Sequence, residues 1–107
     1  MKKIFITAAV AAALCMPAAY GHAAGKEASG EALFKQNCSP CHPEGGNVVN
    51  PKKTLHKKDR VANGVKTDKD IIRLMRNPGP GMTKFDKKTI PDKDAKKIAD
   101  YVLKTFK

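Results

Sequence analysis

The sequence predicts an all-α fold with three to five short helices. Apolar residues recur at helical spacing near the carboxyl end of the chain, and helix-capping residues precede the periodic segments. No stretch alternates between apolar and polar residues in the way that a half-buried strand does. The longest predicted helix opens at Pro91 and continues to about residue 106. Five of its apolar positions would share one face of the helix: Ala95, Ile98, Ala99, Val102 and Phe106.

A first helix is predicted after Ser29. The Ser29 hydroxyl can accept a hydrogen bond from a free amide of the first turn, where Glu31 also suits the positive end of the helix dipole. A stretch with proline and glycine follows, and residues 47–55 are expected to form a loop that packs against an apolar group. The side chains expected to point inward from this loop are Val48, Val49 and Leu55.

Two further helices are expected in the middle of the chain. A short one over about residues 56–62 would end before Gly64, because glycine readily takes the left-handed conformation that closes a helix. Thr67 can cap another helix, which must stop near Asn77 because a proline follows. Residues 78–91 contain repeated proline and glycine, and we expect them to be irregular.

Residues 1–24 have the layout of a secretory signal peptide. Two lysines precede an apolar run, and small residues follow the proline that breaks this run. The run is shorter than the roughly 20 residues that a membrane-spanning helix needs. The expected cut follows Ala24, and Gly21 and Ala23 are the alternatives. Residues 25–107 would then reach the periplasm as a single domain without a membrane span.

The exported part of the chain is small and poor in large apolar residues. It contains no tryptophan, and a core of this size is marginal without a disulfide, a metal or a prosthetic group. Cys15 lies in the predicted leader, so only Cys38 and Cys41 remain. They are too few for a disulfide framework or for a zinc site with four thiolates. The chain is therefore expected to fold around a bound group.

The run Cys38-Ser-Pro-Cys41-His42 indicates what that group is. Two thiols at this spacing can form thioethers with the two vinyl groups of one haem, and the adjacent imidazole of His42 then binds the iron as the proximal ligand. Two alternatives use the same residues. A thioredoxin-like dithiol needs an α/β fold, which the sequence does not predict, and a zinc site would lack a credible fourth ligand.

Three residues are candidates for the second axial ligand of the iron. Met75 lies on the apolar face of a predicted helix and is expected to fill the core, and His56 lies among lysines that favour a solvated position. Met82 follows a Pro-Gly-Pro-Gly segment, in which prolines fix the backbone and glycines allow close approach to a flat cofactor. We therefore predict that His42 and Met82 are the axial ligands. Two filled axial positions leave no open site for a substrate, which argues against an enzyme.

Over residues 28–107 the chain resembles class I cytochromes c, and among them the small photosynthetic cytochrome of algae and cyanobacteria and its bacterial periplasmic relatives. The resemblance rests on five segments: Gly30-Glu-Ala-Leu-Phe34, Cys38-Ser-Pro-Cys41-His42, Gly45-Gly-Asn-Val-Val49 with its continuation to Leu55, Met82-Thr-Lys-Phe85, and Ile98-Ala-Asp-Tyr101-Val-Leu103. It implies a class I cytochrome c fold, in which short helices wrap around one covalently bound haem c.

The resemblance also implies how the helices are arranged. The first and last helices should cross at nearly a right angle, where Gly30 and Phe34 meet Tyr101. Glycine has no side chain, so the two backbones can approach closely at that point. The helices over about 67–76 and 92–106 should close the two sides of the haem pocket.

The same resemblance assigns roles to residues around the haem. The carbonyl group of Pro51 should accept the Nδ1 proton of His42 and so fix the orientation of the imidazole. Phe85 should contact the haem near Met82. The family often has proline directly after the ligand methionine, whereas this chain has Thr83, so the hydrogen bonding of this segment is expected to differ from that of the family.

The chain is strongly basic, with a formal net charge of +11 at pH 7. Its lysines would form a solvated surface and would also steer the protein toward an acidic docking patch on a redox partner. Nucleic acid is not an expected partner, because the protein is exported and has few aromatic residues on which bases could stack. We predict a monomeric periplasmic carrier of single electrons. The alternative is a haem sensor or peroxidase-like protein in which Met82 dissociates from the iron.

Overall fold

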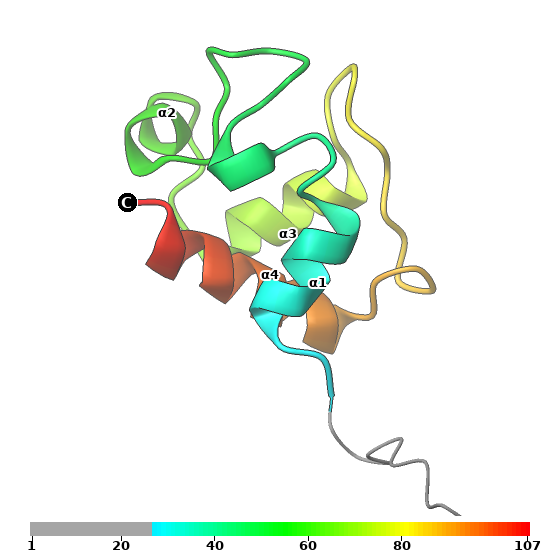
Figure 1. Cartoon of the computed structure of the whole chain (residues 1–107). Helices are drawn as coiled ribbons and strands as arrows, with labels where there is room; N and C mark the ends of the chain where they lie inside the picture. Colours follow the sequence, from blue (N-terminus) through cyan, green and yellow to red (C-terminus); the bar gives the residue numbers. More distant parts are fainter. Residues whose placement is uncertain (1–26) are drawn as a thin grey trace, which may run out of the picture.

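The computed structural model describes residues 27–107, which form four α-helices and one 3₁₀ turn (Figure 1). In chain order these elements are α1 (Gly30–Asn37), η1 (Pro43–Gly45), α2 (Lys57–Ala62), α3 (Asp68–Arg76) and α4 (Asp92–Thr105). No strand occurs in this part of the chain, so the all-α prediction is confirmed. The predicted signal peptide lies outside the described residues. Within the described residues, no helix is long and apolar enough to cross a membrane.

The helix caps that the sequence predicts are formed. The Ser29 hydroxyl accepts a hydrogen bond from the Ala32 amide at 3.1 Å. At the start of α3, the Thr67 hydroxyl accepts from the Asp70 amide at 3.2 Å, and the Asp70 carboxylate accepts from the Thr67 amide at 3.0 Å. Gly64 follows α2 with a φ of +75°. These contacts satisfy amides that helix geometry leaves free, which explains why the predicted boundaries match the observed ones closely.

α1 crosses α4 at a glycine (Figure 1). A Cβ atom at Gly30 would overlap the carbonyl oxygen of Lys97 and lie 3.1 Å from the Cβ of Tyr101, so only glycine permits this approach. One turn later, the centroid of the Phe34 ring lies 5.3 Å from that of Tyr101 and 5.3 Å from that of Phe106. The predicted meeting of Gly30 and Phe34 with Tyr101 is therefore confirmed.

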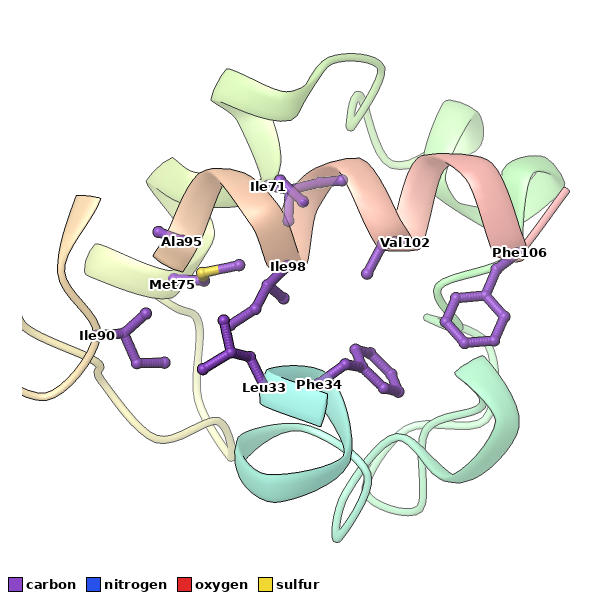
Figure 2. Packing of buried hydrophobic residues seen from close by; sticks show 10 residues of the cluster. Leu33, Phe34, Ile71, Met75, Ile90, Ala95, Ile98, Val102 and Phe106 are labelled. Carbon is purple, nitrogen blue, oxygen red and sulfur yellow. The ribbon is translucent and has the colours of Figure 1, made fainter. Parts of the chain in front are cut away.

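One apolar cluster joins α1, α3 and α4 (Figure 2). Its buried residues are Leu33, Phe34, Ile71, Met75, Ile90, Ala95, Ile98, Ala99, Val102 and Phe106. All five positions that the helical periodicity predicts near the carboxyl end are among them. The cluster is small, as the composition predicted, and it leaves one side of α3 and α4 available to pack against something else.

The carboxyl end of the chain is attached to α2. The Phe106 carbonyl oxygen accepts hydrogen bonds from the Lys57 amide at 3.1 Å and from Nη2 of Arg60 at 3.0 Å. The His56 ring packs edge-on against the Phe106 ring, with centroids 5.6 Å apart. The Phe106 ring also lies close to Gly45, where a Cβ atom would lie 2.5 Å from its Cδ1. The end of α4 therefore fixes the positions of both α2 and η1.

Candidate functional site

A cavity of about 350 Å³ lies between the helices and two irregular segments. One segment is residues 38–55, which we call the loop, and the other is residues 77–85, which we call the strap. In Figure 1 the loop and the strap extend on the same side of the helices. The helices line the cavity mainly with apolar side chains: Phe34, Ile71, Leu74, Met75, Ile98 and Val102. α3 and α4 close its sides, as expected.

The cavity brings together five of the six residues that the sequence singled out for the site. The residues that line it are Cys38, Cys41, His42, Met82 and Phe85. The sixth, Pro51, is exposed and does not line the cavity. The loop supplies the two thiols and the imidazole, whereas the strap supplies the thioether and the phenyl ring.

The imidazole of His42 is held by its own segment of chain. The His42 and Cys41 amides both donate to the Cys38 carbonyl, at 2.8 and 3.1 Å. Nδ1 of His42 lies 2.7 Å from the carbonyl oxygen of Gly46. A carbonyl oxygen can only accept a hydrogen bond, so Nδ1 carries the proton in this contact. Nε2 is then left with the lone pair that can bind a metal.

The predicted role of Pro51 is wrong, because the carbonyl group beside Nδ1 belongs to Gly46. The chain turns back directly after the imidazole, since Glu44 and Gly45 have positive φ values of +52° and +78°. This turn returns the Gly46 carbonyl to the ring. The chain then leaves the ring in a second turn built on Asn47, which is why Pro51 lies at the surface.

The side chain of Asn47 organises the outer part of the loop. Its Oδ1 accepts from the amides of Val49 and Asn50 at 3.0 and 2.9 Å. This turn leaves Val48 and Val49 with 61% and 57% of their surfaces exposed, and Val48 does not line the cavity, so the prediction that Val48 points inward is wrong. Val49 and the half-buried Leu55 both line the cavity, as predicted.

The strap places Met82 on the opposite wall. The strap is attached to α3 at both ends, because the amides of Asn77 and Phe85 donate to carbonyl groups of α3 at 2.8 and 2.9 Å. Met82 lies between these two ends, half-buried and facing the cavity. Gly81 has a φ of +88°, and a Cβ atom there would lie 2.8 Å from Cγ1 of Val49 on the loop. The two walls therefore meet at the mouth of the cavity.

The two rivals of Met82 occupy less suitable places. His56 does not line the cavity, and its exposed ring packs against Phe106 instead. Met75 borders the cavity from α3, but it is 3% exposed and belongs to the apolar cluster, which agrees with the predicted role in the core. Met82 therefore remains the prediction for the second axial ligand.

The environment of Cys38 disfavours a redox-active dithiol. Burial raises the pKa of Cys38 to about 11, with a smaller contribution from Cys41, whereas a redox-active dithiol needs a lowered pKa. Within residues 27–107, no group of three or more His, Cys, Asp or Glu side chains stands close enough together to hold a metal ion.

The sequence did not indicate two residues that contribute to the site. Gly46 acts through its backbone carbonyl, for which no side chain gives a signal. Arg60 lines the cavity with only 5% of its surface exposed, and its Nε donates to the Leu55 carbonyl at 2.6 Å. Burial lowers the pKa of Arg60. In the sequence Arg60 is one of several neighbouring basic residues, and only its hydrogen bond to the distant Phe106 carbonyl distinguishes it.

Comparisons with known proteins agree with this arrangement. Residues 25–102 match the family model described as cytochrome C oxidase, cbb3-type, subunit III. The chain is 41% identical over 76 residues to cytochrome c6 of Synechocystis sp., a match that covers 71% of this chain and 62% of that protein. It is also 36% identical over 74 residues to cytochrome c6 of Cyanidium caldarium, with 69% of this chain and 66% of that protein covered.

A solved structure shares the fold as well. The structure of OmcF, outer-membrane cytochrome F of Geobacter sulfurreducens, matches with a TM-score of 0.72 at 48% identity, and the match covers 74% of this chain and 100% of that one. The chain belongs to the class I monohaem cytochromes c. As a class I cytochrome c, it carries one covalently attached haem c.

The described residues fit this group. The cavity of this chain has a largely apolar lining. One wall carries two thiols and an oriented imidazole, and the other wall carries a thioether. These are the side chains that thioether attachment and axial ligation of a haem require. The match to the two cytochromes c6 spans slightly less than two thirds of the length of those proteins.

Proposed function

We propose that this protein is a periplasmic carrier of single electrons. Its haem would be attached to Cys38 and Cys41, with His42 and Met82 as the axial ligands. The observation that carries the proposal is that one apolar cavity gathers all four side chains, although the strap follows the loop at a distance in the sequence. The haem supplies the site at which an electron is held.

The surrounding residues have separate tasks in such a carrier. The Gly46 carbonyl accepts the Nδ1 proton of His42, which keeps the imidazole in one orientation and makes it a better electron donor. A thioether from Met82 favours the ferrous state and raises the reduction potential. The apolar side chains of α3 and α4 keep water away from the centre. Because two axial ligands leave no open coordination position, we propose that the protein is not an enzyme.

The charge distribution supports a partner that carries an acidic patch. Lys52, Lys53 and Lys84 lie exposed on the loop and the strap and form no ion pair with the described residues. On α4, by contrast, Lys93 and Lys97 both pair with Glu27. The unpaired lysines would therefore set the local field near the mouth of the cavity, where Val48 and Val49 offer an apolar contact.

Location and assembly complete the proposal. The predicted signal peptide supports export to the periplasm, and removal of residues 1–24 would leave the cytochrome domain free of a membrane span. We propose that the carrier acts as a monomer that docks transiently on its redox partners.

The ligand assignment can be tested with two variants. Met82→Ala is expected to remove the weak sulfur-to-iron charge-transfer band in the far red while the haem stays attached, because only a thioether ligand produces that band. The matched control is His56→Ala, which should keep the band. An unchanged band in the Met82→Ala protein would refute His42/Met82 ligation. Rapid binding of carbon monoxide by the reduced wild-type protein at neutral pH would instead favour the sensor or peroxidase-like alternative.

The role of the unpaired lysines can be tested without knowing the partner. The reduced protein is mixed with an anionic oxidant, hexacyanoferrate(III), and separately with a cationic cobalt(III) complex. The double change Lys53→Gln and Lys84→Gln should slow the anionic reaction roughly two- to fivefold at low salt and speed the cationic one. Lys93→Gln with Lys97→Gln is the control with equal charge removal. If both pairs behaved alike, only net charge would matter and no docking surface would be indicated.

A further inference from the structure

The strap is a closed segment whose two ends lie on the same helical turn. The Asn77 amide donates to the Arg73 carbonyl at 2.8 Å, and the Phe85 amide donates to the Met75 carbonyl at 2.9 Å. Between these ends, the only hydrogen bond that the described residues provide to residues 78–84 is a long one, from the Met82 amide to the Gly79 carbonyl at 3.5 Å. The position of Met82 therefore depends on how firmly the two ends are held.

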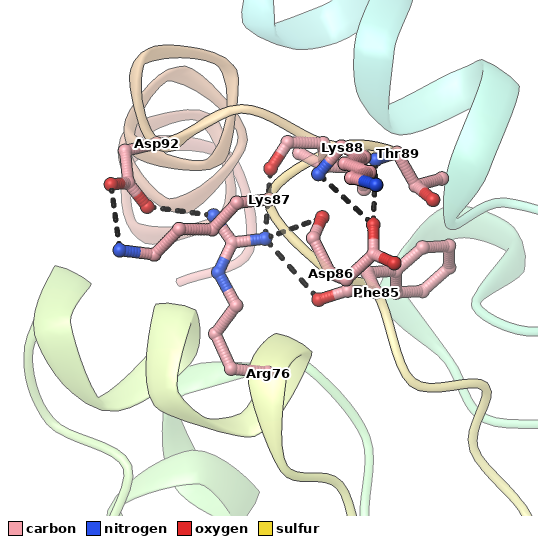
Figure 3. A network of polar contacts seen from close by, with 8 residues as sticks. Arg76, Phe85, Asp86, Lys87, Lys88, Thr89 and Asp92 are labelled. Atoms are coloured by element: carbon pink, nitrogen blue, oxygen red, sulfur yellow. Dashed lines mark hydrogen bonds and ion pairs between the residues drawn. The ribbon is translucent and has the colours of Figure 1, made fainter.

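Arg76, the last residue of α3, holds the second end with its side chain (Figure 3). Its Nη1 lies 3.2 Å from the Phe85 carbonyl oxygen, 3.0 Å from that of Asp86 and 2.8 Å from that of Ile90. Its Nη2 donates to the Asp92 carboxylate at 2.8 Å. One guanidinium group thus connects the end of the strap, the turn that follows it and the start of α4.

The turn after the strap is compact enough to transmit this attachment. The Asp86 carboxylate accepts from the Lys88 and Thr89 amides at 3.0 and 2.8 Å, and these contacts lower the pKa of Asp86, with the Thr89 amide as the largest cause. The Ile90 amide donates to the Asp86 carbonyl at 3.0 Å. Arg76 therefore binds the first and last residues of a closed turn.

The environment of Arg76 makes this contact strong. The side chain is 19% exposed, and its Nε is buried without a hydrogen-bond partner. Leaving a buried donor unpaired is unfavourable, so the Nη contacts must outweigh that cost. Hydrogen bonds from a charged group to neutral carbonyl groups are stronger than those between neutral groups. The contacts with the Phe85 and Ile90 carbonyl groups are part-buried, and they gain further strength where water is scarce.

We propose that Arg76 is a positioning residue that keeps Met82 on the haem iron by clamping the end of the strap to α3. The proposal rests on the proposed ligation by Met82. It distinguishes Arg76 from a residue that only joins α3 to α4, because loss of the clamp should loosen the thioether ligand more than it loosens the fold.

The test is a competition between Met82 and added imidazole for the haem iron of the oxidised holoprotein. Loss of the far-red sulfur-to-iron band measures how much Met82 has been displaced. We call the imidazole concentration that halves the band the imidazole midpoint. In Arg76→Gln this midpoint should fall about tenfold or more, because charge-assisted hydrogen bonds of this kind shift equilibria by at least that factor. Hydrogen exchange of the Phe85 amide should become faster in the same variant. A band that titrates as in the wild-type protein would overturn the proposal.

Two controls separate positioning from general effects. Arg73→Gln removes the same charge from α3, where Arg73 is exposed and, among residues 27–107, pairs only with Asp70. It should leave the imidazole midpoint within about twofold. Ala99→Gly weakens the core of α4 by roughly 1 kcal/mol without touching the strap, and it should also leave the midpoint unchanged. A midpoint that fell equally in Ala99→Gly would show that Arg76 acts only through global stability.

A conservative variant keeps the test decisive if Arg76→Gln does not fold. Arg76→Lys retains the charge, but one ammonium group cannot reproduce a planar fork directed at three carbonyl groups and a carboxylate. We expect it to lower the imidazole midpoint by at least about threefold, a change that the loss of one such hydrogen bond can produce. Full retention of the wild-type midpoint would overturn the clamp. If Met82→Ala kept the far-red band, the ligand assignment itself would fail, which is a different result from an unchanged Arg76 variant.

Discussion

The two walls of the cavity present their ligands in different ways. On the loop, the partner of His42 is four residues away, and the Asn47 turn closes over two and three residues. On the strap, the contacts made by Arg76 span 9 to 16 residues and join α3 to the start of α4. The imidazole is therefore oriented by local structure, whereas the thioether is oriented by packing between helices.

This difference predicts an order of events when the protein is perturbed. Local hydrogen bonds close short loops at little entropic cost, and they survive partial loosening of the helices. The strap has few hydrogen bonds of its own and loses its position as soon as α3, α4 and the intervening turn separate. We therefore expect Met82 to leave the iron before His42 does. Alanine substitutions at one glycine of each wall, Gly45 and Gly81, compare the two walls directly.

The largest effect is expected at Gly45, on the His42 wall. Gly45 has a φ of +78°, and a Cβ atom there would lie 2.5 Å from Cδ1 of the buried Phe106 ring. Gly45→Ala should lower the free energy of unfolding by about 2–4 kcal/mol, because backbone strain and overpacking add. Chemical denaturation of the holoprotein measures this loss. If Gly45→Ala lowered the free energy of unfolding by less than Gly81→Ala does, the Phe106 ring would move aside freely and the predicted order would be wrong.

A smaller effect is expected at Gly81, on the Met82 wall. Its φ is +88°, but the atom that a new Cβ would meet, Cγ1 of Val49 at 2.8 Å, belongs to an exposed side chain that can turn away. Gly81→Ala should cost about 1 kcal/mol, mainly as backbone strain. The imidazole midpoint for loss of the far-red band should nevertheless fall in this variant and stay unchanged in Gly45→Ala. The opposite pattern would contradict the independence of the two walls.

The smallest effect is a pH dependence confined to the Met82 wall. The hydrogen bond from Arg76 is the largest cause that holds the pKa of Asp92 below its ordinary value of 3.8, and Lys87 is the second. A lowered pKa in the folded protein means that the ionised carboxylate stabilises the fold above the ordinary value. This contribution is lost as the pH falls through the lowered pKa.

Comparison of the wild-type protein with Asp92→Asn isolates this effect. The difference between their free energies of unfolding should be constant above pH about 5, shrink as the pH falls below 3.8, and vanish in stronger acid. Since Asp92 is exposed, the difference should be small throughout. The contact between His42 Nδ1 and the Gly46 carbonyl contains no carboxylate, so a Gly45→Ala protein should show the same acid dependence as the wild type.

The predictions from sequence were accurate where a few neighbouring residues suffice. Ser29, Thr67 and Gly64 cap their helices as expected, because a cap is a contact across at most four positions. The apolar face of α4 is buried as its periodicity predicts. Cys38 and Cys41 share the cavity with Met82 as their motifs suggested, although the attachment of haem to these residues stays a prediction.

The sequence misled where a backbone turn decides the outcome. Pro51 was expected beside the imidazole, but the positive φ values of Glu44 and Gly45 bring the Gly46 carbonyl there first. Val48 has the hydrophobicity of an inward-facing residue, yet it lies exposed after Asn47 and does not line the cavity. Hydrophobicity alone does not give the direction of a side chain in an irregular segment.

The sequence by itself determined the helices, their caps and the haem-attachment motif of this class I cytochrome c, because each of these depends on residues a few positions apart. Only the tertiary structure decided which basic residues are buried or half-buried. Arg60 reaches the Phe106 carbonyl across 46 residues, and Arg76 reaches the Ile90 carbonyl across 14. Nothing near either arginine in the sequence announces its partner, since carbonyl groups are the same in every residue and only folding brings them into place.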